Sequence, residues 1–288
     1  MITLIILTYN EELHLQRCLE SVKNLAERII IVDSFSTDKT CEIAQQFGAE
    51  VIQRKFVNQA EQFQWALENT NISTEWVFRL DADEYVLPEL YQEIKEKLNH
   101  LPQEITGINL KRRLYFQSSW IKRGGFYPLR LLRIWRNGAA VMEQKMMDEH
   151  TVLMHGKSID FDHDFVDENL SSLVKWTEKH NNYSTREAIM RLDAQYHFLE
   201  QNQQNLHKSN KQFYLKLPLF LRAFVYFCYR YFIKLGLLDG RNGLIWHVLQ
   251  GFWYQFLVDA KIAQVEYFSK KENKPMKTII EEKLNFKF

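Results

Sequence analysis

The chain has 288 residues, enough for one large domain or two modest ones with a sizeable core. Its apolar share of 46% and charged share of 25% are those of a globular protein, which excludes wholesale disorder and collagen-like repeats. Because 37 Lys and Arg residues balance 36 Asp and Glu residues, the composition argues against a uniformly basic nucleic-acid binder, and no nucleic-acid partner is expected. The unusual figure is the aromatic share, 14%.

The first 100 or so residues alternate strand and helix signals. Runs of aliphatic residues are typical of buried strands, and apolar residues spaced by three or four indicate helices. This alternation predicts an α/β fold in which helices cover a mostly parallel sheet. We expect strands at 2–7, 28–32, 51–52 and 76–80, and helices at 13–22, 39–47, 59–68 and 88–100.

The N-terminal run Ile2 to Leu7 is interpreted as the first buried strand and not as a signal peptide. The three cysteines, Cys18, Cys41 and Cys228, form no C-x-x-C pair and have no histidine at a zinc-finger spacing. They are expected to be buried thiols of a protein from a reducing compartment.

From about Gly107 the pattern changes to short strands separated by polar, glycine-bearing loops. The expected strands are 108–110, 130–135 and 151–154, and a helix is expected from 169 to about 205.

The aromatic residues concentrate in residues 213–268. Between Glu200 and Asp239 the chain has no acid, whereas its bases are Lys208, Lys211, Lys216, Arg222, Arg230 and Lys234. A spanning helix needs about 20 predominantly apolar residues with few charges, and three of these bases interrupt 217–238. This segment is therefore interpreted as an amphipathic hairpin in a bilayer interface. The alternative is a helical subdomain packed on the catalytic core.

Polar side chains follow the predicted strands where each strand ends: Asn10 and Glu11 after the first, Asp33 after the second, Asp81 and Asp83 after the fourth. The carboxyl ends of parallel strands form one rim, where ligands bind. A D-x-D pair there can hold Mg²⁺ or Mn²⁺, which would bridge the phosphates of a nucleoside diphosphate. A lone D-x-D is common on surface turns, but its place directly after a buried strand favours the site.

Asp33 has two interpretations that spacing leaves open. Its carboxylate can accept hydrogen bonds from a nucleobase or a ribose, or it can cap the turn that follows it. The chain has no Walker loop and no G-x-G-x-x-G, so a metal ion is expected to supply the counter-charge to phosphate.

Four ordered motifs carry a family resemblance. They are residues 5–12 (IILTYNEE), 19–22 (LESV), 30–40 (IIVDSFSTDKT) and 80–84 (LDADE). Together they resemble the family 2 inverting glycosyltransferases of the GT-A fold, and within them the branch similar to β-1,4-glucosyltransferases of the lipopolysaccharide or lipooligosaccharide core. The resemblance covers residues 1–100 well and extends more loosely to about 165. It implies a Rossmann-like, mostly parallel sheet flanked by helices. The residues beyond it are expected to form a C-terminal helical extension.

The resemblance also implies roles for individual residues. Asp81 and Asp83 would handle the metal ion and the diphosphate. The expected nucleotide contacts are Thr8, Asn10, Glu11, Asp33, Gln62 and Asp81. The branch usually has a Gln-basic-Asn run before the fourth strand, whereas this chain has Gln62-Phe63-Gln64 and lacks the base.

An inverting transfer needs a carboxylate base opposite the leaving diphosphate. Asp148 and Glu149 are the candidates, and Glu149 is preferred because it matches the glutamate of the branch; the alternative is an acidic surface turn. His163 is either a third metal ligand or a hydrogen-bonded structural histidine. Arg130 and Arg133 either grip phosphates of the acceptor or belong to a solvated face.

The sequence thus predicts a glycosyltransferase that moves a sugar from a nucleotide donor, expected to be UDP-linked, to a lipid-linked or cell-envelope saccharide. The expected domains are 1–168, divided into a nucleotide-sugar half (1–100) and an acceptor half (101–168), and a membrane-associating helical region, 169–288, that contacts the bilayer through 213–268. The expected location is cytoplasmic, on the inner face of the membrane. The alternatives are a nucleotidyltransferase, which would carry a glycine-rich basic loop after the first strand, and a non-catalytic membrane-binding module with a nucleotide pocket.

Overall fold

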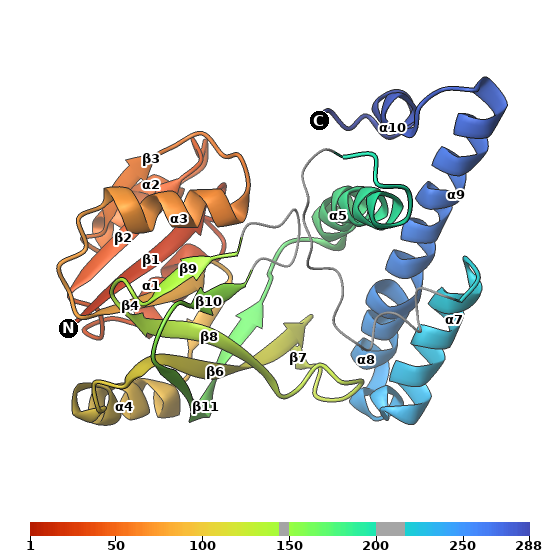
Figure 1. The fold of residues 1–288 in the computed structure, drawn as a ribbon. Helices are drawn as coiled ribbons and strands as arrows, with labels where there is room; N and C mark the ends of the chain where they lie inside the picture. The colour runs from red at the N-terminus through yellow and green to blue at the C-terminus, as the bar shows by residue number, and fades with distance from the viewer. Residues whose placement is uncertain (144–149, 200–216) are drawn as a thin grey trace. The chain divides into compact units, whose positions relative to one another are not determined.

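The computed structural model describes residues 1–143, 150–199 and 217–288, and these residues form two compact units (Figure 1). The first unit consists of residues 1–122 and 126–170, and the second of 123–125 and 171–288. The candidate bases Asp148 and Glu149 lie outside the described residues.

One large sheet organises the first unit, with strand order β3-β2-β1-β4-β8-β6-β11-β5 and β7 paired to β6. Its first half is parallel, as the sequence predicts. Strand β1 pairs with both β2 and β4, and β2 pairs with β3. The bounds of this half are β1 (Ile2–Thr8), β2 (Arg28–Asp33), β3 (Glu50–Gln53) and β4 (Trp76–Asp81). Strand β1 is aliphatic and buried on both faces, which is typical of a parallel strand covered by helices.

The second half of the sheet is mixed. Strand β8 runs antiparallel to β4 and β6, whereas β11 is parallel to β6. The bounds are β5 (Glu84–Val86), β6 (Ile105–Phe116), β7 (Ser119–Trp120), β8 (Leu129–Arg136) and β11 (Lys157–Glu168). A separate ribbon pairs β9 (Ala140–Met142) with β10 (Thr151–Leu153). Strands β5, β7, β9 and β11 were not predicted, and the predicted strand 108–110 is the middle of a strand of 12 residues.

Strands β4 and β5 follow each other directly along the chain, yet β8, β6 and β11 lie between them in the sheet. Only Ala82 and Asp83 connect them. So short a connection requires the sheet to curl until its last strand returns toward β4. The Asp81 to Asp83 turn therefore lies where the two halves of the sheet meet.

Helices cover both faces of the parallel half. The predicted helices are confirmed as α1 (Leu15–Ser21), α2 (Thr40–Gln46), α3 (Gln59–Asn69) and α4 (Pro88–Lys97), followed by a 3₁₀ turn (Leu98–His100). Leu4 and Ile6 of β1 pack with α1, α2 and α4, while Ile5 packs with α3 on the opposite face. This alternation follows from the two-residue period of a strand. The fold is thus the predicted α/β class with a C-terminal helical extension.

The second unit is helical and has its own core. Helix α5 (Leu173–Tyr196) packs on α9 (Tyr254–Glu272) and α10 (Met276–Leu284), with Ile189, Val258 and Ile279 fully buried. The remaining elements are α7 (Leu221–Cys228), a π-helical turn (Tyr229–Ile233), a 3₁₀ turn (Gly236–Asp239), α8 (Gly240–Trp246) and a second π-helical segment (His247–Trp253). Helix α5 ends at Tyr196, earlier than predicted, because His197 adopts a left-handed conformation.

Two features of the second unit refine the predicted amphipathic hairpin. Arg222 is buried and forms an ion pair with Asp259, so it is not a surface base. Among the described residues, none of the helices combines the length and the apolar content that crossing a bilayer requires.

Glu93 ties α4 to β11 in the first unit. Its carboxylate accepts the backbone N–H groups of Asp162 and His163, each at 3.0 Å, and lies 2.8 Å from Lys97 Nζ and 2.9 Å from His163 Nδ1. Burial alone would raise the pKa of Glu93, but these hydrogen bonds outweigh it and lower the pKa to about 2.

A carboxylate whose pKa falls on folding contributes stability above its unfolded pKa of about 4.5 and loses that contribution as the pH drops toward 2. We therefore expect Glu93→Gln to lower the free energy of unfolding by on the order of 3 kcal/mol at pH 7. Urea titrations should show the difference from wild type shrinking between pH 4.5 and 2. A difference that does not depend on pH would contradict this assignment.

Candidate active site

The structure brings the rim residues of the parallel strands together. Thr8 and Asp33 are register partners at the ends of β1 and β2, Asp33 pairs with Gln53 at the end of β3, and Leu7 pairs with Asp81 at the end of β4. Four neighbouring strands thus deliver polar side chains to one edge of the sheet. This is the place at which an open α/β sheet binds its ligand.

Asp33 organises this rim from inside. Its carboxylate is fully buried and accepts hydrogen bonds from Thr8 Oγ1 at 2.9 Å, the Ser36 N–H at 2.8 Å, Ser36 Oγ at 2.5 Å and Gln53 Nε2 at 3.4 Å. Burial raises the pKa of Asp33, but these donors outweigh it, so the net shift is downward and the group stays ionised. The turn interpretation of Asp33 thus has direct structural support, and a contact with a base stays a prediction.

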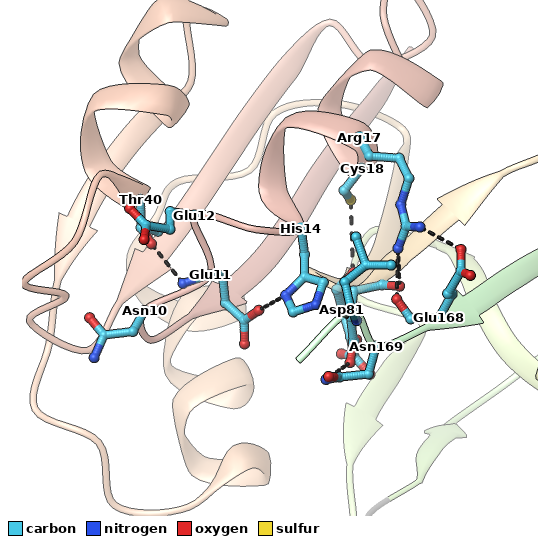
Figure 2. Close-up of polar contacts among 12 residues, drawn as sticks. Asn10, Glu11, Glu12, His14, Arg17, Cys18, Thr40, Asp81, Glu168 and Asn169 are labelled. Atoms are coloured by element: carbon cyan, nitrogen blue, oxygen red, sulfur yellow. Dashed lines mark hydrogen bonds and ion pairs between the residues drawn. The ribbon is translucent and has the colours of Figure 1, made fainter. Parts of the chain in front are cut away.

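Hydrogen bonds join the loop after β1 to the loop after β2. Asn10 has a left-handed backbone (φ 56°), donates its N–H to Ser36 Oγ at 2.8 Å and accepts the Thr37 N–H at 2.9 Å. The Glu11 N–H donates to Thr40 Oγ1 at 2.7 Å (Figure 2). The polar residues predicted to contact a nucleotide therefore also build the shape of the rim.

Gln62 is buried at the same rim, where it contacts Arg54. This arginine supplies a basic residue beside Gln62, which the sequence run 62–64 lacks. Its Oε1 accepts a hydrogen bond from Arg54 Nη1 at 2.8 Å, and its Nε2 donates to the Arg54 carbonyl at 3.2 Å. Phe63, at the position where the resembled branch has a base, is buried in the core. Arg54, directly after β3, thus places a cation beside Gln62. Its position one residue beyond a strand was the signal that sequence reasoning overlooked.

Asp81 ends β4 beside two arginines. Its carboxylate oxygens lie 3.6 Å from Arg79 Nη2 and 3.6 Å from Arg133 Nη2, and Gln59 Nε2 donates to it at 3.3 Å. Arg133 is buried and forms an ion pair with Glu84, whose side chain is only 2% exposed. Glu84 also accepts the Asp81 N–H at 2.9 Å. The Arg133–Glu84 pair thus fixes the end of β4.

Of the two arginines predicted to hold an acceptor, only Arg130 is exposed. It pairs with Asp160 at 2.7 Å, and each side chain is about half exposed. Arg133 is buried next to Asp81, so the structure does not place it on a surface that an acceptor could reach. The expectation of an acceptor grip for Arg133 is not supported by this placement.

Asp167 is an acid of the site that sequence reasoning missed, because β11 was not predicted. It is the register partner of Glu84 and pairs with Arg112 at 3.1 Å. Burial raises its pKa to about 6, and the charges of Asp83 and Asp81 add to the rise, while Arg112 opposes it. The signal in the sequence was the run from Ile159 to Asp162, in which apolar residues alternate with acids as is typical of a strand with one polar face.

His163 is placed apart from the aspartate turn. Its ring nitrogen Nδ1 lies 2.9 Å from Glu93 of α4, which corresponds to the hydrogen-bonded structural histidine of the two interpretations. The structure does not bring it together with Asp81 and Asp83 as a third ligand.

The residues at the turn fit a magnesium-type ion that is shared with a ligand. Mg²⁺ is usually bound by one or two carboxylates together with substrate phosphates, and not by an all-protein cage. Among the described residues no group of three or more His, Cys, Asp or Glu side chains forms such a cage. Burial is the main cause of the raised pKa of Asp167, and the nearby charges of Asp83 and Asp81 raise it further, so these three carboxylates act on one another at the turn. Asp81 and Asp83 are the residues that would hold the ion.

The fold and the rim define an α/β domain of the kind that binds a nucleotide at the carboxyl ends of its strands. The family description "Glycosyl transferase family 2" matches residues 3–157, more than half of the chain. The chain belongs to this family.

Relatives support the same classification. An uncharacterized glycosyltransferase of Rickettsia bellii is 39% identical over 94 residues, which cover 33% of this chain and 31% of the relative. The lipopolysaccharide core biosynthesis glycosyltransferase LpsC of Rhizobium meliloti is 35% identical over 138 residues, which cover 46% of this chain and 50% of LpsC. The alignments thus span a third to a half of these relatives' own lengths.

Among solved structures, glucosyl-3-phosphoglycerate synthase of Mycobacterium tuberculosis, in a complex with Mn²⁺, UDP and glucosyl-3-phosphoglycerate, is similar at 20% identity and a TM-score of 0.33. The match covers 40% of this chain and 44% of that chain.

We expect Arg133→Leu to lower the free energy of unfolding by about 3–5 kcal/mol, because the buried Glu84 carboxyl would lose its partner and burial, which already raises its pKa, would force it to take up a proton. Adding Glu84→Gln should recover much of the loss. Arg130→Leu is the matched control, since its exposed pair contributes at most about 1 kcal/mol. Urea unfolding of the four proteins measures these values, and equal losses for the two arginine variants would contradict the assignment.

Proposed function

We propose that the protein is an inverting glycosyltransferase that uses a nucleotide sugar, with UDP as the expected nucleotide, and Mg²⁺ or Mn²⁺. The observation that carries this proposal is the convergence of Thr8, Asp33 and Asp81 on one sheet edge, with Asp83 in the turn directly beyond it. The family membership of residues 3–157 supports it.

The rim residues would act by binding and orientation. Asp33 would fix the loops that follow β1 and β2 around the nucleobase of the donor. Gln62 and Arg54 would line the nucleotide end of the rim. A bound divalent ion supplies Lewis acidity and neutralises charge on the leaving diphosphate. Asp81 and Asp83 would hold that ion.

Direct displacement at the anomeric carbon requires the acceptor hydroxyl to lose its proton as it attacks the face opposite the diphosphate. We assign the base to Glu149, with Asp148 as the alternative, on the family resemblance alone. The carboxylate takes the hydroxyl proton, the acceptor oxygen forms the new bond, and the carbon–oxygen bond to the diphosphate breaks. The sugar carbon is thereby inverted.

The proposed acceptor is a lipid-linked or cell-envelope saccharide. The similarity to LpsC, which is named for lipopolysaccharide core biosynthesis, supports this class, as does the resemblance to the β-1,4-glucosyltransferase-like branch. Exposed Arg130 is the residue of this chain that would contact acceptor phosphates.

The second unit is proposed to bind the surface of the membrane that presents this acceptor. We define the apolar corner as Phe232, Ile233, Leu235, Leu237 and Leu238. Their exposed fractions run from 40% to 71%, so these apolar side chains remain in contact with solvent. Neighbouring exposed apolar residues of this kind often mark a protein or membrane contact.

Two bases flank the apolar corner. Lys234 lies over the Tyr229 ring at 5.7 Å, and Arg230 over the Tyr226 ring at 4.7 Å. Aromatic rings paired with cations beside exposed aliphatic residues are typical of a bilayer interface carrying anionic lipids.

We expect Asp83→Asn to reduce sugar transfer by about 100-fold or more while leaving the thermal unfolding midpoint unchanged, since the variant loses charge at a partly exposed turn. Release of UDP from a panel of UDP-sugars with Mn²⁺, with membrane lipid extracts as acceptors, measures the effect. Asp162→Asn, at a side chain that is 81% exposed, is the control and should retain turnover. Near-normal turnover of Asp83→Asn would remove the metal assignment.

For the membrane, we expect the full chain to sediment with anionic liposomes and to do so less at higher salt. The double variant Phe232→Ser with Ile233→Ser should lose most of this binding. Val174→Ser, at an equally exposed apolar residue of α5, is the matched control. Unchanged sedimentation of the double variant would show that the apolar corner is not the contact.

A further inference from the structure

The side chain of Asp83 has one hydrogen-bonding partner among the described residues, and that partner comes from the far end of the first unit. Asn169 Nδ2 donates to Asp83 Oδ2 at 3.0 Å, across 86 residues of sequence. Asp83 lies in the two-residue connection between β4 and β5. The amide of Asn169 is thus a hydrogen-bonding contact that orients this carboxylate.

Asn169 is itself held in place by its neighbours. The Glu168 N–H donates to the Asp83 carbonyl at 3.1 Å, so the two backbones are joined beside the side-chain contact. The Leu170 N–H donates to His14 Nε2 at 2.8 Å, and His14 Nδ1 lies 2.6 Å from Glu11 of the rim (Figure 2). Backbone anchors on both sides thus leave the Asn169 side chain little freedom.

Arg17 of α1 completes the support. Its guanidinium donates to the Glu168 carboxylate at 2.5 Å and to the Glu168 carbonyl at 2.7 Å, and it reaches the Asp83 carbonyl at 3.4 Å (Figure 2). It also lies over the Tyr85 ring at 4.4 Å. One side chain thus joins the aspartate turn to the end of β11.

We propose that Asn169 is a positioning residue for Asp83, and that it prepares this carboxylate for a divalent cation. Asn169 occupies Oδ2, while Oδ1 has no hydrogen bond from the described residues and is the oxygen offered to the ion. The inference rests on the proposed function, because the ion is the one shared with the nucleotide diphosphate. Partners that orient a ligand in this way commonly change metal affinity by about 10–100-fold when they are removed.

The test compares Asn169→Leu with wild type in the full chain. Calorimetry measures the affinity for Mn²⁺ in the presence of UDP, and separately the affinity for UDP in EDTA. Asn137→Leu is the matched control, because Asn137 also donates its side-chain amide once, to the Ile72 carbonyl at 2.8 Å, away from the rim. We expect Asn169→Leu to weaken Mn²⁺ binding about 10-fold or more, with UDP affinity in EDTA and the thermal midpoint close to those of the control.

A conservative variant separates positioning from packing. Asn169→Gln keeps the amide donor on a longer side chain and should recover part of the Mn²⁺ affinity that Asn169→Leu loses. If Asn169→Leu does not fold, Asn169→Ser replaces it in the same measurements.

Three results would overturn the inference. The first is a Mn²⁺ affinity of Asn169→Leu equal to that of wild type. The second is an equal loss of UDP affinity in EDTA, which would point to a general distortion of the rim. The third, no Mn²⁺-dependent UDP binding by wild type, would overturn the proposed function as well, so the two failures are distinguishable.

Discussion

The buried carboxylate of Glu84 is the group on which the arrangement of the site depends. It accepts the backbone N–H that closes β4, pairs with Arg133 of β8, and sits in β5, the last strand of the sheet order. A charge in that position must be paired, because an isolated buried carboxylate is too costly to retain. The pair joins β5 to β8, and the Asp81 N–H that Glu84 accepts joins both to the end of β4, in the parallel half, where the sheet curls. This contact fixes the positions of Asp81 and Asp83. The loops after β1 and β2, which form the rest of the rim, are joined by their own hydrogen bonds.

The parallel half could be predicted from the sequence, because each of its strands is an uninterrupted aliphatic run and each helix has a regular apolar spacing. The polar rim followed from topology: once the strands are parallel, residues such as Thr8 and Asp33 must share an edge. Strand β11 could not be recognised as easily, since its acids are interspersed with its apolar residues and its pairing register shifts between Asp160 and Asp164. With β11 missed, Asp167 and Asn169 were missed too. Their contacts depend on strand register across more than 80 residues, which no local pattern encodes.

The C-terminal half shows why counting charged and aromatic residues along a chain is an incomplete guide. Arg222 counted as a basic surface residue in the sequence, but Asp259, 37 residues later, neutralises it inside the second unit. The aromatic residues divide likewise: Tyr254 belongs to the core, whereas Phe232 is about half exposed. What is left on the surface is a smaller and more localised combination of apolar and basic side chains. The contacts that each residue makes in the folded state, and not the composition of the segment, decide which residues face outward.

The position of β11 bears on how far the catalytic module extends. The part of the chain that matches the family ends at residue 157, the first residue of β11, yet β11 lies between β6 and β5 inside the sheet. A fragment or chimera cut at that boundary would open the sheet in its interior and expose two unpaired strand edges. The smallest segment that could be exchanged between relatives as a unit runs through Leu170, where His14 captures the backbone. Recombination between members of the family would therefore be expected to keep α1 and the end of β11 together. Most strands of the sheet lie between these two elements in the sequence.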